Sequence, residues 1–159
     1  VEGIATFASL SLPVAGRYTL TAVSAGLDSA VSEPFEVVAA PPPPPPAPTV
    51  IRRGTFAGQN GYTAQGTLQI ERTPEGGETL KLNSNFRVSA GAGAITVWLA
   101  RSSGALNTST SLRVGTINRV FSGEFTFPIP SGGSSGYTHV IVYCDPFRIN
   151  FGAATLTNP

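Results

Sequence analysis

Hydrophobic and polar residues alternate with a period of two along short stretches of the first 40 residues. The alternation is clearest at Ile4–Phe7, Tyr18–Val23 and Phe35–Val38, and turn-forming proline and glycine residues separate these runs. Because successive side chains of a strand point to opposite faces, this pattern predicts three or four short antiparallel strands and no helix.

The same period-two pattern returns after residue 50 and continues to residue 157. Turns are expected at Gly58–Gly61, Gly76–Gly77 and Ser131–Gly136. Eight strands at this spacing are typical of a β-sandwich or a β-barrel. The expected strands are Ile51–Phe56, Gly66–Glu71, Thr79–Leu82, Ile95–Leu99, Arg113–Ile117, Glu124–Pro128, Thr138–Cys144 and Phe147–Phe151.

Between the two patterned regions lies an almost uninterrupted run of proline, Pro41–Pro48. Proline fixes φ and lacks a backbone donor, so this run is expected to form a polyproline II helix. With a rise of about 3.1 Å per residue, it would hold its neighbours roughly 25 Å apart. We interpret it as a stiff spacer, and the alternative is a docking ligand for an aromatic-lined groove. The predicted domains are residues 1–40 and 50–159, joined by a linker at 41–49.

Motifs in residues 1–39 resemble the C-terminal half of bacterial immunoglobulin-like repeats. Tyr18 stands where such folds place a tyrosine corner, and Leu20 where antibody domains carry a cysteine. A complete immunoglobulin sandwich has about seven strands in about 100 residues, so roughly half of it is missing. Its apolar face and open edges need a cover. Either the chain is cut from a longer one, or strands from another copy complete the module. The motifs are Gly3–Phe7, Ala15–Leu20, Gly26–Leu27 and Phe35–Val37.

The C-terminal run Tyr137–Leu156 resembles the end of the DM13 family. It has a valine-rich strand, the pair Tyr143-Cys144, and a phenylalanine strand that closes in Phe151–Ala154. The resemblance spans residues 50–157 and implies a second β-sandwich there. The expected fold is therefore all-β, a partial immunoglobulin-like sandwich and a DM13-like sandwich joined by a polyproline II linker. Upstream residues that fit the same pattern are Gly54–Phe56, Gly66–Ile70, Leu80–Leu82, Phe86, Val97–Leu99, Gly115, Gly123 and Phe127–Pro130.

The DM13 family is named for an electron-transfer role proposed for its cysteine. The resemblance therefore implies a redox role for Cys144, either as a thiol or as the ligand of a prosthetic group such as haem. The family often has Gly-Pro-Asp before its Val-x-Leu strand, whereas this chain has Gly93-Ala94-Ile95. The lost carboxylate removes one candidate polar or metal-binding group.

Cys144 also has a purely structural interpretation. On one strand, Val140, Val142 and Cys144 share a face, and His139 lies on the other. Unless a bulge intervenes, this parity excludes a Cys–His pair within the strand, and it makes Cys144 a small buried hydrophobe at the end of an apolar row. It is the single cysteine, so no intrachain disulfide forms, and His139 is the single histidine, so no multi-histidine metal cluster is expected.

The remaining polar candidates point to structure more than to chemistry. Glu75 and Glu78 are expected to be solvated in the turn Pro74–Glu78, and Asp145 to stabilise the turn before the last strand. Trp98 is expected in the core, and the alternative is a sugar-stacking platform formed with Tyr62 or Tyr143. Asn107-Thr108-Ser109 is a glycosylation sequon in a polar loop.

Composition bounds the cellular context. The net charge is +1, charged residues make up 12%, and Arg52-Arg53 is the only adjacent basic pair, so nucleic-acid binding is not expected. Low charge with abundant small polar residues is typical of secreted, cell-surface or periplasmic β proteins. No apolar run approaches the ~18 residues of a membrane span. The sequence has no methionine, so we expect a processed chain or a fragment.

These observations lead to one main functional hypothesis and two alternatives. The first is a non-enzymatic structural or adhesive protein that associates with itself or with another surface protein, as a filament or stalk subunit. The second is a redox module that uses Cys144. The third is carbohydrate adhesion through Trp98.

Overall fold

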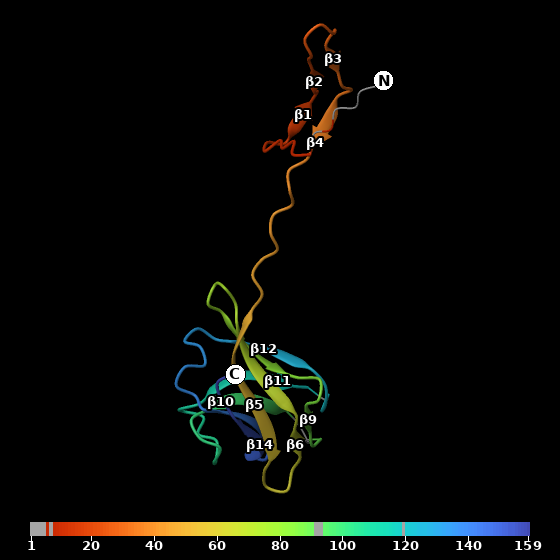
Figure 1. Ribbon diagram of the computed structural model, residues 1–159. Coiled ribbons are helices and arrows are strands. Elements are labelled where there is room, and N and C mark those ends of the chain that lie inside the picture. The colour runs from red at the N-terminus through yellow and green to blue at the C-terminus, as the bar shows by residue number, and fades with distance from the viewer. Residues whose placement is uncertain (1–5, 7, 91–93, 119) are drawn as a thin grey trace. The chain divides into compact units, whose positions relative to one another are not determined.

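A computed structural model of the chain describes residues 6, 8–90, 94–118 and 120–159 (Figure 1). These residues form strands, turns and loops and no helix, which confirms the all-β class. The described residues therefore contain no helix that could cross a membrane. The chain divides into two compact units, residues 1–45 and 46–159. The strand expected at Ile4–Phe7 lies outside the described residues except for Thr6, which is in no strand. Gly93 also lies outside the described residues.

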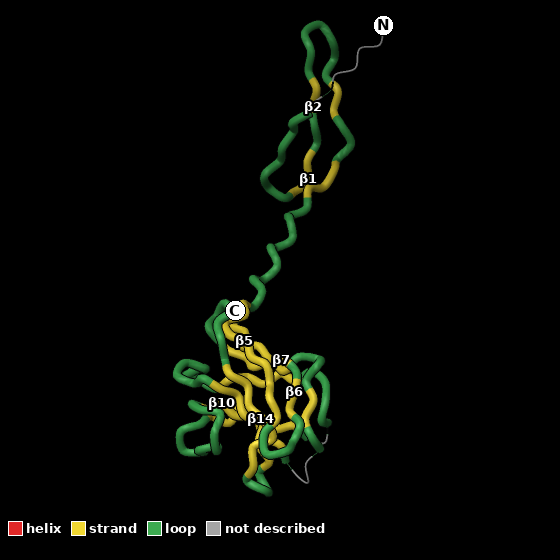
Figure 2. The backbone as a smooth tube through the Cα atoms, turned by 60° about the horizontal axis from the view of Figure 1, so that its bottom comes forward, coloured by secondary structure: helices red, strands yellow, loops and turns green. Residues whose placement is uncertain are grey.

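The first unit is a narrow antiparallel ribbon (Figure 2). Strand β1 (Gly16–Tyr18) pairs with β4 (Phe35–Val37), and β2 (Thr21–Ala22) pairs with β3 (Ala30–Val31). The chain reverses after β2, where Leu27 N donates to Ser24 O. The ribbon is thus a pair of two-stranded sheets with two open edges.

No described residue of this ribbon has a buried side chain. Large apolar side chains stand 41% to 81% exposed instead, so the described part contains no core. An isolated two-stranded ribbon is marginally stable in water because one apolar face stays wet. These exposed residues are Leu10, Val14, Leu20, Val23, Leu27, Val31 and Val38.

The second unit is built on one eight-stranded antiparallel sheet with the order β11-β10-β13-β14-β5-β7-β8-β12. All eight strands predicted from period-two alternation are present, with ends moved by a few residues. A short extra pair, β6 (Ala64–Gln65) with β9 (Arg87–Val88), was not predicted. The eight strands are β5 (Thr49–Gly58), β7 (Thr67–Arg72), β8 (Glu78–Leu82), β10 (Ile95–Ala100), β11 (Leu112–Ile117), β12 (Phe125–Ile129), β13 (His139–Cys144) and β14 (Ile149–Thr155).

This sheet curls into a nearly closed barrel, which corrects the expectation of a two-sheet sandwich. Strand β5 is long enough to pair with β7 along Thr49–Thr55 and with β14 along Phe56–Gly58, so it carries the sheet around. The edge strands β11 and β12 then meet through side chains. A Cβ placed on Gly115 of β11 would lie 2.1 Å from Phe127 Cδ1 of β12, so only glycine allows this approach.

The barrel interior is filled by inward side chains from all eight strands. Phe86 belongs to this core without solvent exposure and contacts Phe56 and Phe125 edge-on, with ring centroids 5.3 Å and 5.9 Å away. Edge-to-face packing of this kind suits the aromatic quadrupole. The second unit therefore has the core that the ribbon lacks.

Candidate functional site

Cys144 ends β13 with its side chain inside the barrel. It is 0% exposed and pairs with Ile95 of β10 and Ile149 of β14. Val140 and Val142 share its inward face, whereas His139 belongs to the other face, so the parity predicted from the sequence is confirmed. His139 Nδ1 lies 2.8 Å from Thr138 Oγ1. The arrangement gives the thiol apolar neighbours and no histidine partner.

A polar chain crosses the outer face of the barrel beside this strand. Trp98 Nε1 donates to Thr96 Oγ1 at 2.8 Å, and Thr96 Oγ1 donates to Asp145 Oδ1 at 3.0 Å. Arg113 Nη2 lies 3.8 Å from Asp145 Oδ2. The expectation that Trp98 lies in the core is therefore wrong, because β10 turns Val97 inward and Trp98 outward. Asp145 ties a turn to β10 through Thr96.

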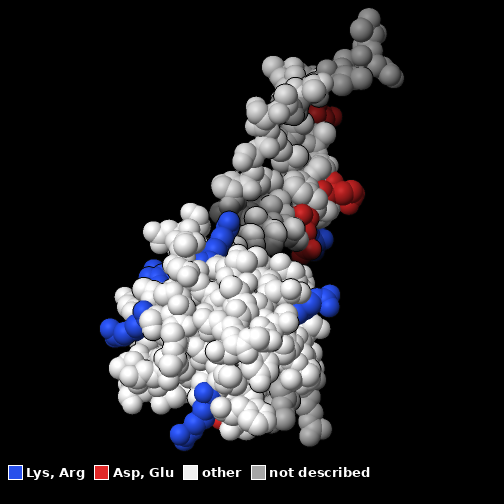
Figure 3. Space-filling model, turned by 90° about the horizontal axis from the view of Figure 1, so that it is seen from below, with Lys and Arg blue, Asp and Glu red and all other residues white. Residues whose placement is uncertain are grey.

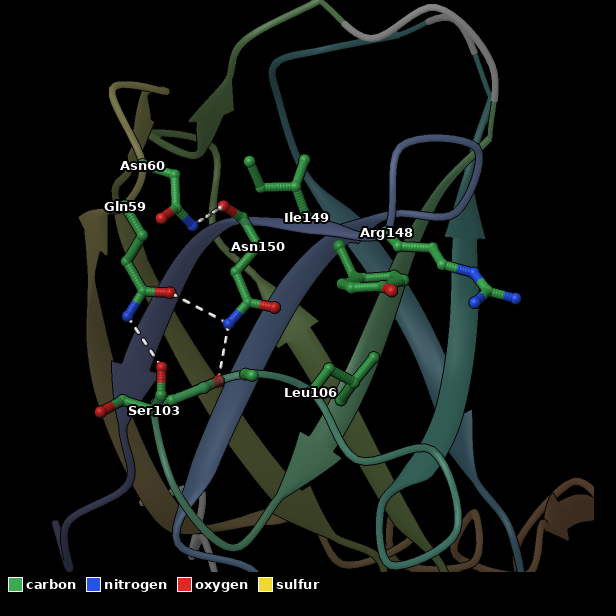
Figure 4. A pocket seen from close by; sticks show the side chains of 10 residues that line it. Gln59, Asn60, Ser103, Leu106, Arg148, Ile149 and Asn150 are labelled. Atoms are coloured by element: carbon green, nitrogen blue, oxygen red, sulfur yellow. Dashed lines mark hydrogen bonds between the residues drawn. The ribbon is translucent and has the colours of Figure 1, made fainter.

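A cleft of about 510 Å³ opens on the same outer face (Figure 4). Its apolar part includes Tyr143 and Leu106, which pack against a small cluster of outward side chains, Ala100, Ile141 and Ala153. Its polar part comes from the turn after β5, the loop after β10 and the start of β14. Segments far apart in the sequence thus build one concave surface.

Three amide side chains form the polar wall of this cleft. Asn150 is 6% exposed, and its Nδ2 donates to Gly104 O at 2.7 Å and to Gln59 Oε1 at 3.2 Å. Gln59 Nε2 donates to Ser103 O at 2.8 Å, and Asn60 Nδ2 donates to Asn150 O at 3.0 Å. Because both donors of Asn150 are engaged by acceptors, its orientation is fixed.

Two residues that line the cleft have an unfavourable backbone conformation. Among the described residues, Asn60 (φ 54°) and Arg148 (φ 52°) are the non-glycine residues with positive φ, and both line the cleft. Asparagine tolerates this conformation, whereas arginine adopts it at a cost. The turn in which Arg148 N donates to Asp145 O holds Arg148 there.

Asn107 lies in the exposed loop between β10 and β11. Its Oδ1 accepts a hydrogen bond from Ser109 N at 3.0 Å, which leaves the amide nitrogen free of the turn. Exposure of the sequon is compatible with glycosylation, which stays a prediction.

Glu78 differs from its predicted environment, whereas Glu75 is exposed as expected. The Glu78 side chain is 7% exposed, and its Oε1 accepts from Arg72 Nη2 at 2.6 Å and its Oε2 from Ser134 N at 2.7 Å. Burial alone would raise the pKa of Glu78, but these hydrogen bonds outweigh it and leave the pKa below its ordinary value of 4.5. Glu78 is a structural carboxylate that ties β8 to the loop before β13.

Sequence reasoning missed the cleft residues Gln59, Asn60, Arg148 and Asn150. The turn Gly58–Gly61 was predicted and is present, but nothing in it indicated a binding surface. The decisive feature is a bulge in the β13–β14 pairing, which aligns Tyr143 with Asn150 and leaves Phe151 between registers. A single sequence carries no clear signal for such a bulge.

Comparisons with known proteins identify one relation. Residues 55–156 match the family model described as DM13: Electron transfer DM13. No curated protein and no solved structure matches the chain. Nothing in these comparisons tests the immunoglobulin-like interpretation of residues 1–39, which stays a prediction.

Proposed function

Because this chain belongs to the DM13 family through residues 55–156, we propose a function for a DM13 barrel that carries an open β-ribbon. The chain is an exported, non-enzymatic structural or adhesive protein whose copies associate at the cell surface. The observation that carries this proposal is the set of exposed apolar side chains in the described part of the ribbon.

The described part of the ribbon leaves seven large apolar side chains 41% to 81% exposed. Leu10, Leu20 and Val31 line an apolar groove of about 430 Å³. Burying apolar surface stabilises a complex by about 25 cal/mol per Å², and contiguous exposed patches mark interaction sites. Unpaired ribbon edges add backbone groups that a further strand satisfies.

Charge favours a second copy as the occupant. Residues 1–45 contain one Arg and four carboxylates, a net charge of −3, whereas residues 46–159 contain nine Arg or Lys and five carboxylates, a net charge of +4. On the face in Figure 3 the basic side chains of the barrel stand apart from one another, without a continuous stripe. The ribbon of one copy is thus attracted to the barrel of another, and two ribbons repel each other.

A contact between unlike surfaces of identical chains does not close on itself unless its rotation forms a ring. Heterologous contacts of this kind build open filaments. A filament or stalk subunit is therefore the form of assembly that the charge distribution supports, and the stiff proline run suits it as a spacer. The low content of charged residues supports export.

Two matched valine substitutions test this proposal. Val31 of the ribbon is 63% exposed, and Val120 of the barrel is 56% exposed. In sedimentation velocity of the whole chain, wild type is expected to show concentration-dependent association, which Val31→Glu abolishes because a buried, unpaired carboxylate opposes assembly. Val120→Glu is expected to associate as wild type does. A wild-type chain that stays monomeric at every concentration would contradict the proposal.

Electron transfer is the second candidate, and the description of the family favours it. The residues around Cys144 do not fit a prosthetic group: the thiol is fully buried among Ile95, Ile149 and their neighbours, and the described residues hold no group of three or more His, Cys, Asp or Glu arranged to bind a metal. His139 belongs to the opposite face. What remains of this candidate is thiol chemistry at Cys144 itself, which requires the strand end to open.

A further inference from the structure

We propose that the outer cleft of the barrel binds a pyranose unit of a saccharide, with Arg148 favouring a sugar that carries a carboxylate. This inference goes beyond assembly through the ribbon and does not depend on it. It rests on three features of the cleft: one free acceptor, one apolar floor and one unpaired cation.

The free acceptor is Asn150 Oδ1. Both donors of the Asn150 amide are engaged, whereas its oxygen accepts no hydrogen bond from the described residues. Figure 4 shows this oxygen turned away from Gln59 and toward the open cleft that Leu106 and Arg148 flank. An acceptor on a side chain 6% exposed, held by two hydrogen bonds, is prepared for a donor from a ligand.

The apolar floor consists of Tyr143 and Leu106, which rest on the outward cluster of β10, β13 and β14. A half-buried aromatic ring offers a flat apolar surface beside the hydrogen-bonding wall. A pyranose presents a matching pair of surfaces, since its C–H groups form an apolar face and its hydroxyls both donate and accept. The cleft, about 510 Å³, lies within the usual range of about 300–1,000 Å³ for small-ligand sites.

Arg148 determines the charge of the preferred sugar. Its side chain is exposed, forms no ion pair with the described residues and belongs to the lining of the cleft; Figure 4 shows its guanidinium at the rim, pointing away from Asn150. A guanidinium binds a carboxylate with two parallel hydrogen bonds. A phosphate deep in the cleft is disfavoured, because Asn150 Oδ1 would face it with negative partial charge. We therefore place the carboxylate of a uronic acid at Arg148 and hydroxyls at Asn150.

Isothermal titration calorimetry of the full chain with tetragalacturonate and with cellotetraose tests this inference. Tetragalacturonate is expected to bind more tightly than cellotetraose, and Arg148→Gly to weaken its binding by up to about fivefold, because an exposed ion pair contributes up to about 1 kcal/mol. Glycine also accepts the left-handed backbone, so this variant keeps the fold. Cellotetraose binding is expected to stay within about twofold in the same variant.

Two further variants complete the experiment. Leu106→Glu places a carboxylate on the apolar floor and is expected to abolish binding of both sugars; circular dichroism checks that the barrel stays folded. Arg87→Ala is the control and is expected to leave binding of both sugars unchanged. The inference is overturned if sugar binding survives Leu106→Glu, or if the wild-type chain gives no binding heat with either sugar. It is also overturned if a polar peptide binds the cleft and neither sugar does. Val31→Glu is expected to leave sugar binding unchanged, so failure of assembly and failure of the cleft are distinguishable.

Discussion

Cys144 shows how one buried residue limits the chemistry of the molecule. The thiol is 0% exposed and lies against strand neighbours that are apolar on both sides. A thiol reacts as thiolate and needs access to solvent, so a buried cysteine is inert until its strand opens. We therefore expect a thiol reagent such as DTNB to modify native protein orders of magnitude more slowly than protein in denaturant.

A Ser135→Cys variant supplies the control for that measurement. Ser135 is exposed, so its thiol is expected to react at once while Cys144 of the same molecule does not. Equal rates for the two thiols would contradict the burial of Cys144 and its purely structural role.

Glu78 carries a pH dependence whose sign follows from its hydrogen bonds. Its folded pKa is lowered, because hydrogen bonds from Arg72 and Ser134 outweigh the effect of burial. A lowered pKa gives stability that is present above the unfolded pKa of about 4.3–4.5 and is lost as pH falls through the folded pKa. Glu78→Gln is expected to lower the free energy of unfolding by about 1–2 kcal/mol at pH 7. That difference is expected to be smaller at pH 3 than at pH 7, because the contribution declines as pH falls below the unfolded pKa.

Urea unfolding followed by circular dichroism at pH 7 and pH 3 measures this effect. Glu75→Gln is the matched control, because Glu75 is exposed in the neighbouring turn and is expected to change the unfolding midpoint little. A Glu78→Gln penalty that is the same at both pH values would show that packing, not charge, explains the contribution of Glu78.

At the scale of elements, barrel closure depends on the approach of β11 to β12. A Cβ on Gly115 would lie 2.1 Å and 2.4 Å from two ring atoms of Phe127, so Gly115→Ala forces the ring or a strand to move. Overpacking of this kind costs about 1–3 kcal/mol. The thermal midpoint of Gly115→Ala is expected to fall by several degrees. Gly77→Ala is the control, since its Cβ would meet only Thr73 Oγ1 at 3.4 Å; an equal fall in both variants would contradict this role of Gly115.

The same scale shows what the sequence predicts and what it leaves open. Alternation predicted all eight strands of the main sheet because each turns one apolar face to a shared core. Strands β6 and β9 have two residues each, which is too short for the alternation of hydrophobic and polar residues to appear. Trp98 was misplaced because an apolar residue inside a strand does not reveal its face. The cleft was missed because a bulge at Phe151 sets its geometry.

At the scale of the molecule, two units of opposite charge and unequal burial share one chain. The barrel has a complete core, and the described ribbon has none, so the stability of the ribbon depends on what covers it. Tyr18 OH donates to Val14 O at 2.8 Å within the ribbon, and the immunoglobulin-like origin of residues 1–39 stays a prediction. The proposed assembly of copies would give both units a role.

Electron microscopy of the purified full chain in negative stain tests that assembly most directly. At low salt we expect filaments, which shorten at high salt because screening weakens attraction between unlike units. The Val31→Glu variant is expected to give only discrete particles. The account would be contradicted if the wild-type chain gave only uniform single particles at low salt, at a protein concentration at which the ribbon is folded as β-structure.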